Sequence, residues 1–253
     1  MTQLFASILV HDIMGGGAFN WRCGEVTDDT QMAMCVMKAV MDSEANSSID
    51  LFRFADLCKH YFVNWYDSDP KDIGGTCARG IQMLKCGKNP RVTSSIGNGG
   101  LMRAWPLAVI DELPANFVQN DLTYMNQICD NAIEKYHNTM RSCLIGTRSR
   151  RSKSVFSECM SPTGSVVNTL HNALYYLHQS NKFEDGIIWP VNDGGDSDTI
   201  ACVTGSLVGA YFGYKAIPER WIKQLDSNVK EILDEYINWC CRYLERKRTN
   251  FVD

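Results

Sequence analysis

The sequence predicts an all-α fold, arranged as a single domain over residues 1–253. Several segments carry apolar residues at helical spacing, whereas no segment shows the alternation of apolar and polar residues that is typical of a half-buried strand. Stretches rich in Gly, Asp, Ser or Pro separate these segments. We find no internal repeat and no low-complexity segment, and a chain of 253 residues is long enough to bury one substantial hydrophobic core.

Two of the predicted helices begin at clusters of threonine and aspartate. Thr27-Asp28-Asp29-Thr30 precedes the apolar run 32–41, and Asp196-Ser197-Asp198-Thr199 precedes the apolar run 200–213. Side-chain oxygens at a helix start accept hydrogen bonds from free N–H groups, and the helix dipole favours negative charge there. Helix capping therefore explains either cluster taken alone.

The two clusters together support a second interpretation, a metal site. If both helix starts face each other, four carboxylates and two hydroxyls meet at one end of an apolar core. Charges of the same sign would repel strongly at that distance, and a divalent cation removes the repulsion. Oxygen ligands without a nearby His or Cys favour Mg²⁺ or Mn²⁺ over zinc, and the number of carboxylates makes two ions plausible.

The remaining helices are predicted from amphipathic spacing and from their boundary residues. Glycines at 205, 209 and 213 leave one side of the helix after Asp198 almost free of side chains, so a neighbouring helix is expected to pack closely there. The other predicted helices cover residues 51–65, 72–87, 121–145, 166–178 and a final stretch that starts at Pro218.

A loop of small residues, Ser94–Gly100, precedes Leu101-Met102-Arg103. Its three glycines and one Asn leave backbone N–H groups open to a phosphate or carboxylate, although a plain flexible turn explains the composition equally well. Pro106 is expected to kink the helix that follows this loop.

Composition places the chain in a broad class. The net charge of −4 gives no reason to expect binding to nucleic acid or to a membrane surface. The 11 cysteines are scattered without a CxxC motif, which favours reduced thiols in a reducing compartment. We see no secretory signal and no apolar run long enough to span a membrane, so we expect a cytoplasmic protein.

Several of these motifs resemble those of the ADP-ribosylglycohydrolase family, in the family's order, and most closely its dinitrogenase reductase-activating glycohydrolase branch. Any one motif would be weak evidence alone, whereas their order and context make the match specific. The resemblance covers about residues 15–221 and rests on the segments Gly24–Met32, Gly97–Arg103, Thr163–Thr169, Asn192–Thr199 and Ala216–Trp221.

The resemblance implies an orthogonal helical bundle that holds two divalent cations, Mg²⁺ or Mn²⁺. It also implies hydrolysis of the glycosidic bond between ADP-ribose and a modified side chain, with an ADP-ribosylated protein or a small ADP-ribose conjugate as partner. The matching metal ligands are Thr27, Asp28, Asp29, Asp196, Asp198 and Thr199. Asp72 matches an acidic residue near the distal ribose, and the catalytic set we expect is Asp28, Asp29, Asp72 and Asp198. The matching substrate-binding residues are Gly97, Asn98, Gly99, Gly100, His137, Gly164 and Ser165.

The match also has departures. The family's first helix, rich in Gly and Ala, is not found before Gly15-Gly16-Gly17, and residues around the expected substrate differ from the pattern. Two hypotheses therefore stay open: an active metal-dependent hydrolase, and a non-catalytic relative that binds ADP-ribose, a nucleotide or a protein partner. The Asp-x-Asp-x-Thr motif of haloacid-type phosphatases is excluded, because it requires a preceding buried strand and one more residue before the Thr.

Overall fold

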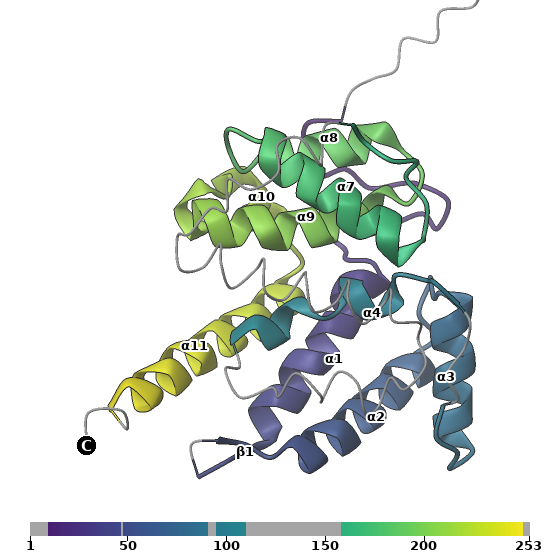
Figure 1. The fold of residues 1–253 in the computed structure, drawn as a ribbon, viewed down its shortest axis with the longest axis vertical. Helices are drawn as coiled ribbons and strands as arrows, with labels where there is room; N and C mark the ends of the chain where they lie inside the picture. The colour runs from purple at the N-terminus through teal and green to yellow at the C-terminus, as the bar shows by residue number, and fades with distance from the viewer. Residues whose placement is uncertain (1–9, 47, 91–94, 110–157, 250–253) are drawn as a thin grey trace, which may run out of the picture.

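The computed structural model describes residues 10–46, 48–90, 95–109 and 158–249, and their regular structure is almost entirely helical. Figure 1 shows two groups of helices that meet at a short central segment. The lower group consists of α1 (Asp28–Asp42), α2 (Leu51–Asp67), α3 (Gly75–Lys85) and α11 (Ser227–Thr249). The upper group consists of α7 (Val166–Gln179), α8 (Asp185–Asp193), α9 (Ser197–Phe212) and α10 (Glu219–Gln224), with the short 3-10 helix η2 (Tyr214–Ala216) after α9.

The central segment contains α4 (Gly99–Met102) and the 3-10 helix η1 (Trp105–Val109). It contributes buried residues to both groups, because Leu101 packs with α7 and α9 while Met102 packs with α1 and α3. Below it, β1 (Glu44–Ala45) and β2 (Ser48–Ile49) form a two-stranded antiparallel pair with Glu44 opposite Ile49.

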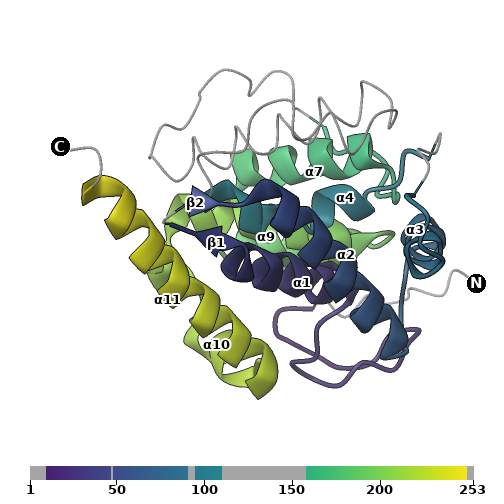
Figure 2. The ribbon, with the colours of Figure 1, turned by 90° about the horizontal axis from the view of Figure 1, so that it is seen from below.

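The core of the lower group is built around α1. Its residues Met32, Ala33, Met37, Ala39 and Val40 are completely buried, as expected from their helical spacing. Helices α2 and α11 cover α1 from two sides, and the view from below shows α11 running along the edge of the molecule (Figure 2). The start of α1 is thereby fixed at the junction of the two groups.

Close packing of α8 on α9 explains the small residues of α9. A Cβ at Gly205 would lie 2.9 Å from the Ile187 side chain, and a Cβ at Gly186 would lie 2.6 Å from Val208. The expectation of a closely packed neighbour is confirmed for Gly205, whereas Gly213 follows the last residue of α9 and ends the helix with a positive φ of 81°.

The all-α prediction is confirmed, with two differences in detail and one segment that the structure does not test. The β1–β2 pair was not expected, because two residues per strand are too few for alternation to be visible. The helix after the small-residue loop is not kinked by Pro106, since α4 ends at Met102 and Pro106 lies in η1. Residues 121–145, including His137, and the basic run 148–153 lie outside the described residues.

Two further observations concern the cellular setting. In the part of the chain that the structure describes, no helix is both long and apolar enough to cross a membrane. The cysteines in these ranges are all free thiols. A cytoplasmic location stays a prediction.

Candidate functional site

The first threonine–aspartate cluster does not act as a helix cap. Thr27 is the N-cap residue of α1, but no side chain caps the helix there. Instead the Thr27 hydroxyl donates a hydrogen bond of 2.9 Å to the carboxylate of Asp29. Asp28 is 8% exposed and Asp29 only 1% exposed. Two acidic side chains are therefore buried at a helix start whose N-cap residue, Thr27, makes no capping hydrogen bond.

The backbone before α1 is held by the junction between α10 and α11. Gly24 has a φ of 84°, and a Cβ there would lie 1.8 Å from the carbonyl oxygen of Gln224, so the close approach requires glycine. The Asp226 N–H donates to the Gly24 carbonyl at 3.0 Å. The Gln31 amide donates to the Val26 carbonyl at 2.8 Å and fixes the last turn of backbone before the helix.

The second cluster, at the start of α9, is held by the segment before α7. The Asp196 N–H donates to the Pro162 carbonyl at 3.1 Å. Gly195 has a φ of 65°, and a Cβ there would lie 2.1 Å from the same carbonyl oxygen. The carboxylate of Asp196 accepts hydrogen bonds from the Thr199 hydroxyl, at 3.2 Å, and from the side-chain amide of Asn98. The Asp196 side chain thus joins α9 to the small-residue loop.

The small-residue loop pairs with the start of α7. Gly97 and Ser165 form an isolated β-bridge, and the Asn98 N–H donates to the Gly164 carbonyl at 3.0 Å. The Gly97 N–H donates to the Ser95 hydroxyl at 3.3 Å. The sequence predicted that the backbone N–H groups of residues 97–100 are open to an anion. Two of these four, those of Gly97 and Asn98, have partners within the chain. The loop, Gly164, Ser165 and Asp196 are nevertheless brought together as one constellation.

The carboxylates of the two clusters influence one another. Burial is the main cause that raises the pKa of Asp29 to about 7, with the charges of Asp198 and Asp28 adding to it and hydrogen bonding from Thr27 and Thr199 opposing it. Burial also raises the pKa of Asp28 to about 6, helped by the charges of Asp72 and Asp198. The two helix starts therefore do face each other across a short distance.

Asp72 and Asp196 complete the acidic constellation. Burial raises the pKa of Asp72, and the negative charge of Asp198 acts in the same direction. Burial likewise raises the pKa of Asp196, against a hydrogen bond from Asn98. Five aspartates from α1, α9 and the α2–α3 connection thus share one electrostatic environment, which favours either bound protons or a bound cation.

The donor set fits a hard divalent cation in its chemistry. All the groups are carboxylate or hydroxyl oxygens, and Oδ1 of Asp29 is a buried oxygen without a hydrogen-bond partner. Within the described ranges, however, no three His, Cys, Asp or Glu side chains are grouped tightly enough to hold an ion as they stand. Binding would require these carboxylates to turn toward a common centre.

Sequence reasoning missed one buried contributor to the constellation, Thr169. This residue of α7 is completely buried, and its hydroxyl accepts a hydrogen bond of 3.0 Å from the Asn98 side-chain amide. The sequence feature that could have identified Thr169 is its position on the core-facing side of the helix, between Val166 and Leu170, where an apolar residue would be expected. Thr169 therefore orients Asn98, which in turn contacts Asp196.

Comparison with known proteins gives consistent matches. The family model described as ADP-ribosylglycohydrolase matches residues 3–121 and 111–250. The chain is 27% identical over 238 residues to the ADP-ribosyl-[dinitrogen reductase] glycohydrolase of Rhodospirillum rubrum, covering 85% of this chain and 79% of that protein. It is 28% identical to the ADP-ribosylarginine hydrolase Tri1 of Serratia proteamaculans, covering 85% of this chain and 67% of that protein.

A solved structure shares the fold. It is described as an ADP-ribosylglycohydrolase-related protein complex and is 24% identical to the chain. The match has a TM-score of 0.76 and covers 93% of this chain and 87% of that one. At this level of identity the likeness establishes the helical architecture.

Proposed function

Because the chain belongs to the ADP-ribosylglycohydrolase family, it is a hydrolase, and we propose that it cleaves the bond between ADP-ribose and a modified side chain with the help of divalent cations. Arginine is the favoured side chain, since one relative is named an ADP-ribosylarginine hydrolase. The observation that carries the metal dependence is the buried carboxylate of Asp29, whose Oδ1 has no partner and whose neighbours are also acidic.

The residues that would hold two cations, Mg²⁺ or Mn²⁺, are Thr27, Asp28, Asp29, Asp196, Asp198 and Thr199. When bound, such ions supply positive charge that orients ribose hydroxyls and promotes the ionisation of water. The chain itself supplies the oxygens, which would have to turn toward a common centre to bind an ion. Asn98 supports this set, because its amide contacts Asp196 and is fixed by Thr169.

The protein groups then act on the bond at C1 of the ribose. Departure of the side-chain nitrogen leaves positive charge on the sugar ring, and the carboxylates of the constellation stabilise that charge. Water forms the new bond to C1 as the bond between C1 and nitrogen breaks, and the proton that this water loses is passed on to the leaving nitrogen. Asp72 is our candidate for the base that accepts the proton of this water, because it belongs to the acidic constellation and burial raises its pKa above the ordinary value, which makes it a stronger base.

The test is release of free ADP-ribose from an arginine-ADP-ribosylated substrate in the presence of Mg²⁺, Mn²⁺ or a chelator. We expect release with either ion or both, none with chelator, and loss of release in Asp28→Ala and Asp198→Ala with the fold retained by circular dichroism. Full activity in either variant would contradict the assignment of the centre. Tight ADP-ribose binding without cleavage of any linkage would favour the non-catalytic alternative.

A further inference from the structure

The segment that leads into α1 carries an exposed apolar hairpin, residues 14–22, which we call the glycine hairpin. We infer that the glycine hairpin is the docking surface for the folded protein that carries the ADP-ribosylated side chain. This inference rests on the proposed function and adds to it the part of the molecule that distinguishes a protein substrate from a small conjugate.

The glycine hairpin is held in a defined conformation by its backbone. Gly16 and Trp21 exchange two hydrogen bonds of 2.8 Å, and Asn20 donates to the Gly17 carbonyl at 3.2 Å. The tight reversal uses positive φ values at Gly16 (116°), Gly17 (70°) and Asn20 (50°). Glycine adopts this region at little cost, and Asn tolerates it better than most residues. The turn therefore presents its side chains in fixed directions.

Two large apolar side chains of the hairpin are exposed to solvent, alongside the exposed polar side chains of Asn20 and Arg22. Met14 is 65% exposed and Phe19 is 45% exposed. The Phe19 ring lies edge-on to Trp21 with 6.3 Å between centroids, so the two rings support each other. Isolated exposed apolar residues are common, but a Phe ring packed on a Trp ring in one ordered turn, with an exposed Met two residues before Gly16, is typical of a contact surface.

Contacts with Lys71 place the hairpin beside the acidic constellation. The Lys71 ammonium lies 4.9 Å from the centroid of the Trp21 ring and 2.8 Å from the Glu25 carboxylate. Lys71 directly precedes Asp72, and Glu25 lies two residues before Thr27. In Figure 2 the purple segment that contains the hairpin loops out beside α1, at the lower edge of this view. A macromolecule whose modified side chain enters the constellation therefore meets this hairpin at the rim.

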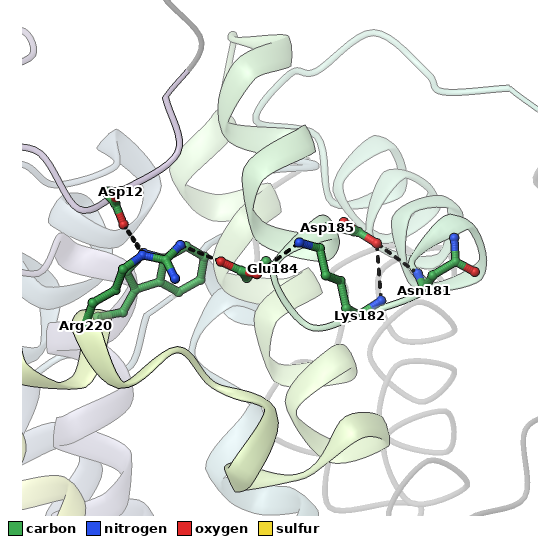
Figure 3. A network of polar contacts seen from close by, with 7 residues as sticks. Asp12, Asn181, Lys182, Glu184, Asp185 and Arg220 are labelled. Carbon is green, nitrogen blue, oxygen red and sulfur yellow. Dashed lines mark hydrogen bonds and ion pairs between the residues drawn. The ribbon is translucent and has the colours of Figure 1, made fainter.

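Polar contacts anchor both ends of the segment that carries the hairpin. Before it, Asp12 accepts hydrogen bonds from Arg220 and from the Trp221 indole, and Arg220 also contacts Glu184 (Figure 3). After it, the Arg22 N–H donates to the Glu25 carboxylate at 2.8 Å. Because the chain before the hairpin is tied to α10 and the chain after it is held by Glu25, docking on the hairpin would cost little additional ordering of the chain.

A protein substrate fits these observations better than a small one. On the leaving-group side, ADP-ribosyl-arginine extends beyond the bond to be cleaved by a single amino acid, whose guanidinium, amino and carboxylate groups offer little apolar surface to Met14 or Phe19. A folded protein brings the surface around its modified residue into contact with the rim, and burial of apolar area there adds binding energy. The hairpin is thus expected to lower the KM for proteins without affecting the chemistry.

The experiment compares two substrates and two surface variants. In the double variant Met14→Ser/Phe19→Ser, kcat/KM on an arginine-ADP-ribosylated protein should fall about tenfold through KM, which corresponds to a loss of about 1.4 kcal/mol of binding energy. Release from ADP-ribosyl-arginine should stay unchanged. The matched control is Phe52→Ser, because Phe52 is 90% exposed but lies by the start of α2, near β2 and the far end of α1 (Figure 1).

Other results would overturn the inference. Equal losses on both substrates, no loss on the protein, or the same loss in Phe52→Ser would each do so. A native mass that changes from dimer to monomer in the double variant would assign the hairpin to contact with a second copy instead. If the wild type releases ADP-ribose from neither substrate, the proposed function fails. Binding of the ADP-ribosylated protein to Asp28→Ala, with and without the hairpin substitutions, then decides the docking role separately.

Discussion

The two aspartate-rich helix starts have nearly the same composition but very different surroundings. At the start of α1, Asp28 and Asp29 are buried, whereas at the start of α9 Asp198 is exposed. Helix α1 is surrounded by α2, α4, α9 and α11, and the chain before it is held against Gln224. Helix α9 begins after the glycine turn 194–195, where Asp193, Gly195 and Asp198 are exposed.

The difference indicates a division of work between the two helices. In the metal-free site the ionised form is most unfavourable for the carboxylates of α1, because burial and neighbouring charges raise the pKa of Asp29 to about 7. Asp198 contributes charge to that environment but remains open to solvent and substrate. A bound cation would therefore mainly offset the charge repulsion and burial of the α1 carboxylates. The exposed Asp198 of α9 would contribute oxygens that solvent and substrate can reach.

The largest effect is expected from removing one charge at each helix start. Asp29→Asn and Asp198→Asn should each lower kcat/KM by at least ~10³-fold, as loss of a central catalytic group does. Their effects on stability should differ. At pH 8 in chelator, Asp29→Asn should raise the free energy of unfolding by on the order of 2 kcal/mol, because it removes a desolvated charge, and Asp198→Asn should change it little.

Urea unfolding with and without chelator measures this difference, and circular dichroism controls for the fold. Equal stabilisation by both substitutions would show that the two helix starts are electrostatically equivalent. That result would contradict the division of work.

A smaller effect is expected from pH in the metal-free protein. Asp28 and Asp29 have pKa values of about 6 and about 7 in the folded chain, above the ordinary value of 3.8. The folded state therefore keeps protons that the unfolded chain releases. The stability from these groups is fully present below about pH 4 and is lost as pH rises through 7, by on the order of 3 kcal/mol.

Denaturant titrations in chelator between pH 4 and 8 test this dependence. Millimolar Mn²⁺ should flatten the curve near pH 7, because the cation favours the ionised carboxylates. Asp29→Asn should remove most of the slope in chelator. A stability that rises between pH 5 and 7 and is unaffected by Asp29→Asn would contradict the prediction.

The sequence predicted the helices that bury an apolar face, because burial of one face imposes a period that is visible in the residues. It also predicted that Asp28, Asp29, Asp196 and Asp198 converge, since both clusters begin buried helices. It did not predict α8 as a helix: nine residues with Pro190 inside show no clear period. Nor did it predict the β1–β2 pair, whose two-residue strands depend on the end of α1.

The parts of the site that the sequence could not show are contacts between distant segments. Nothing local indicates that Gly24 must be glycine because of Gln224, or that Thr169 fixes Asn98. The glycine hairpin is another example, since its triple glycine indicated only a loop. Its partner, Lys71, is about fifty residues away in the chain. Such pairings follow from the packing of the helices.

The smallest effect should come from a hydroxyl that supports the start of α9. The Tyr176 hydroxyl donates to the carboxylate of Asp193, the last residue of α8, and lies 3.4 Å from the Cys159 thiol. Burial, with the hydrogen bond to Asp193, raises the pKa of Tyr176, so the hydroxyl stays protonated as a donor. It thereby restrains the glycine turn that places Asp196 and Asp198.

Tyr176→Phe should lower the free energy of unfolding by about 1 kcal/mol, the usual worth of one such bond. It should also weaken Mn²⁺ binding about tenfold, because groups that orient metal ligands have effects of that size. Isothermal titration well below the unfolding temperature separates the two consequences, with Tyr175→Phe as the control that removes a neighbouring hydroxyl. Unchanged Mn²⁺ affinity in Tyr176→Phe would show that the Gly194–Gly195 turn places the α9 carboxylates without help from α7. The comparison between the helix starts would then rest on the surroundings of α1 alone.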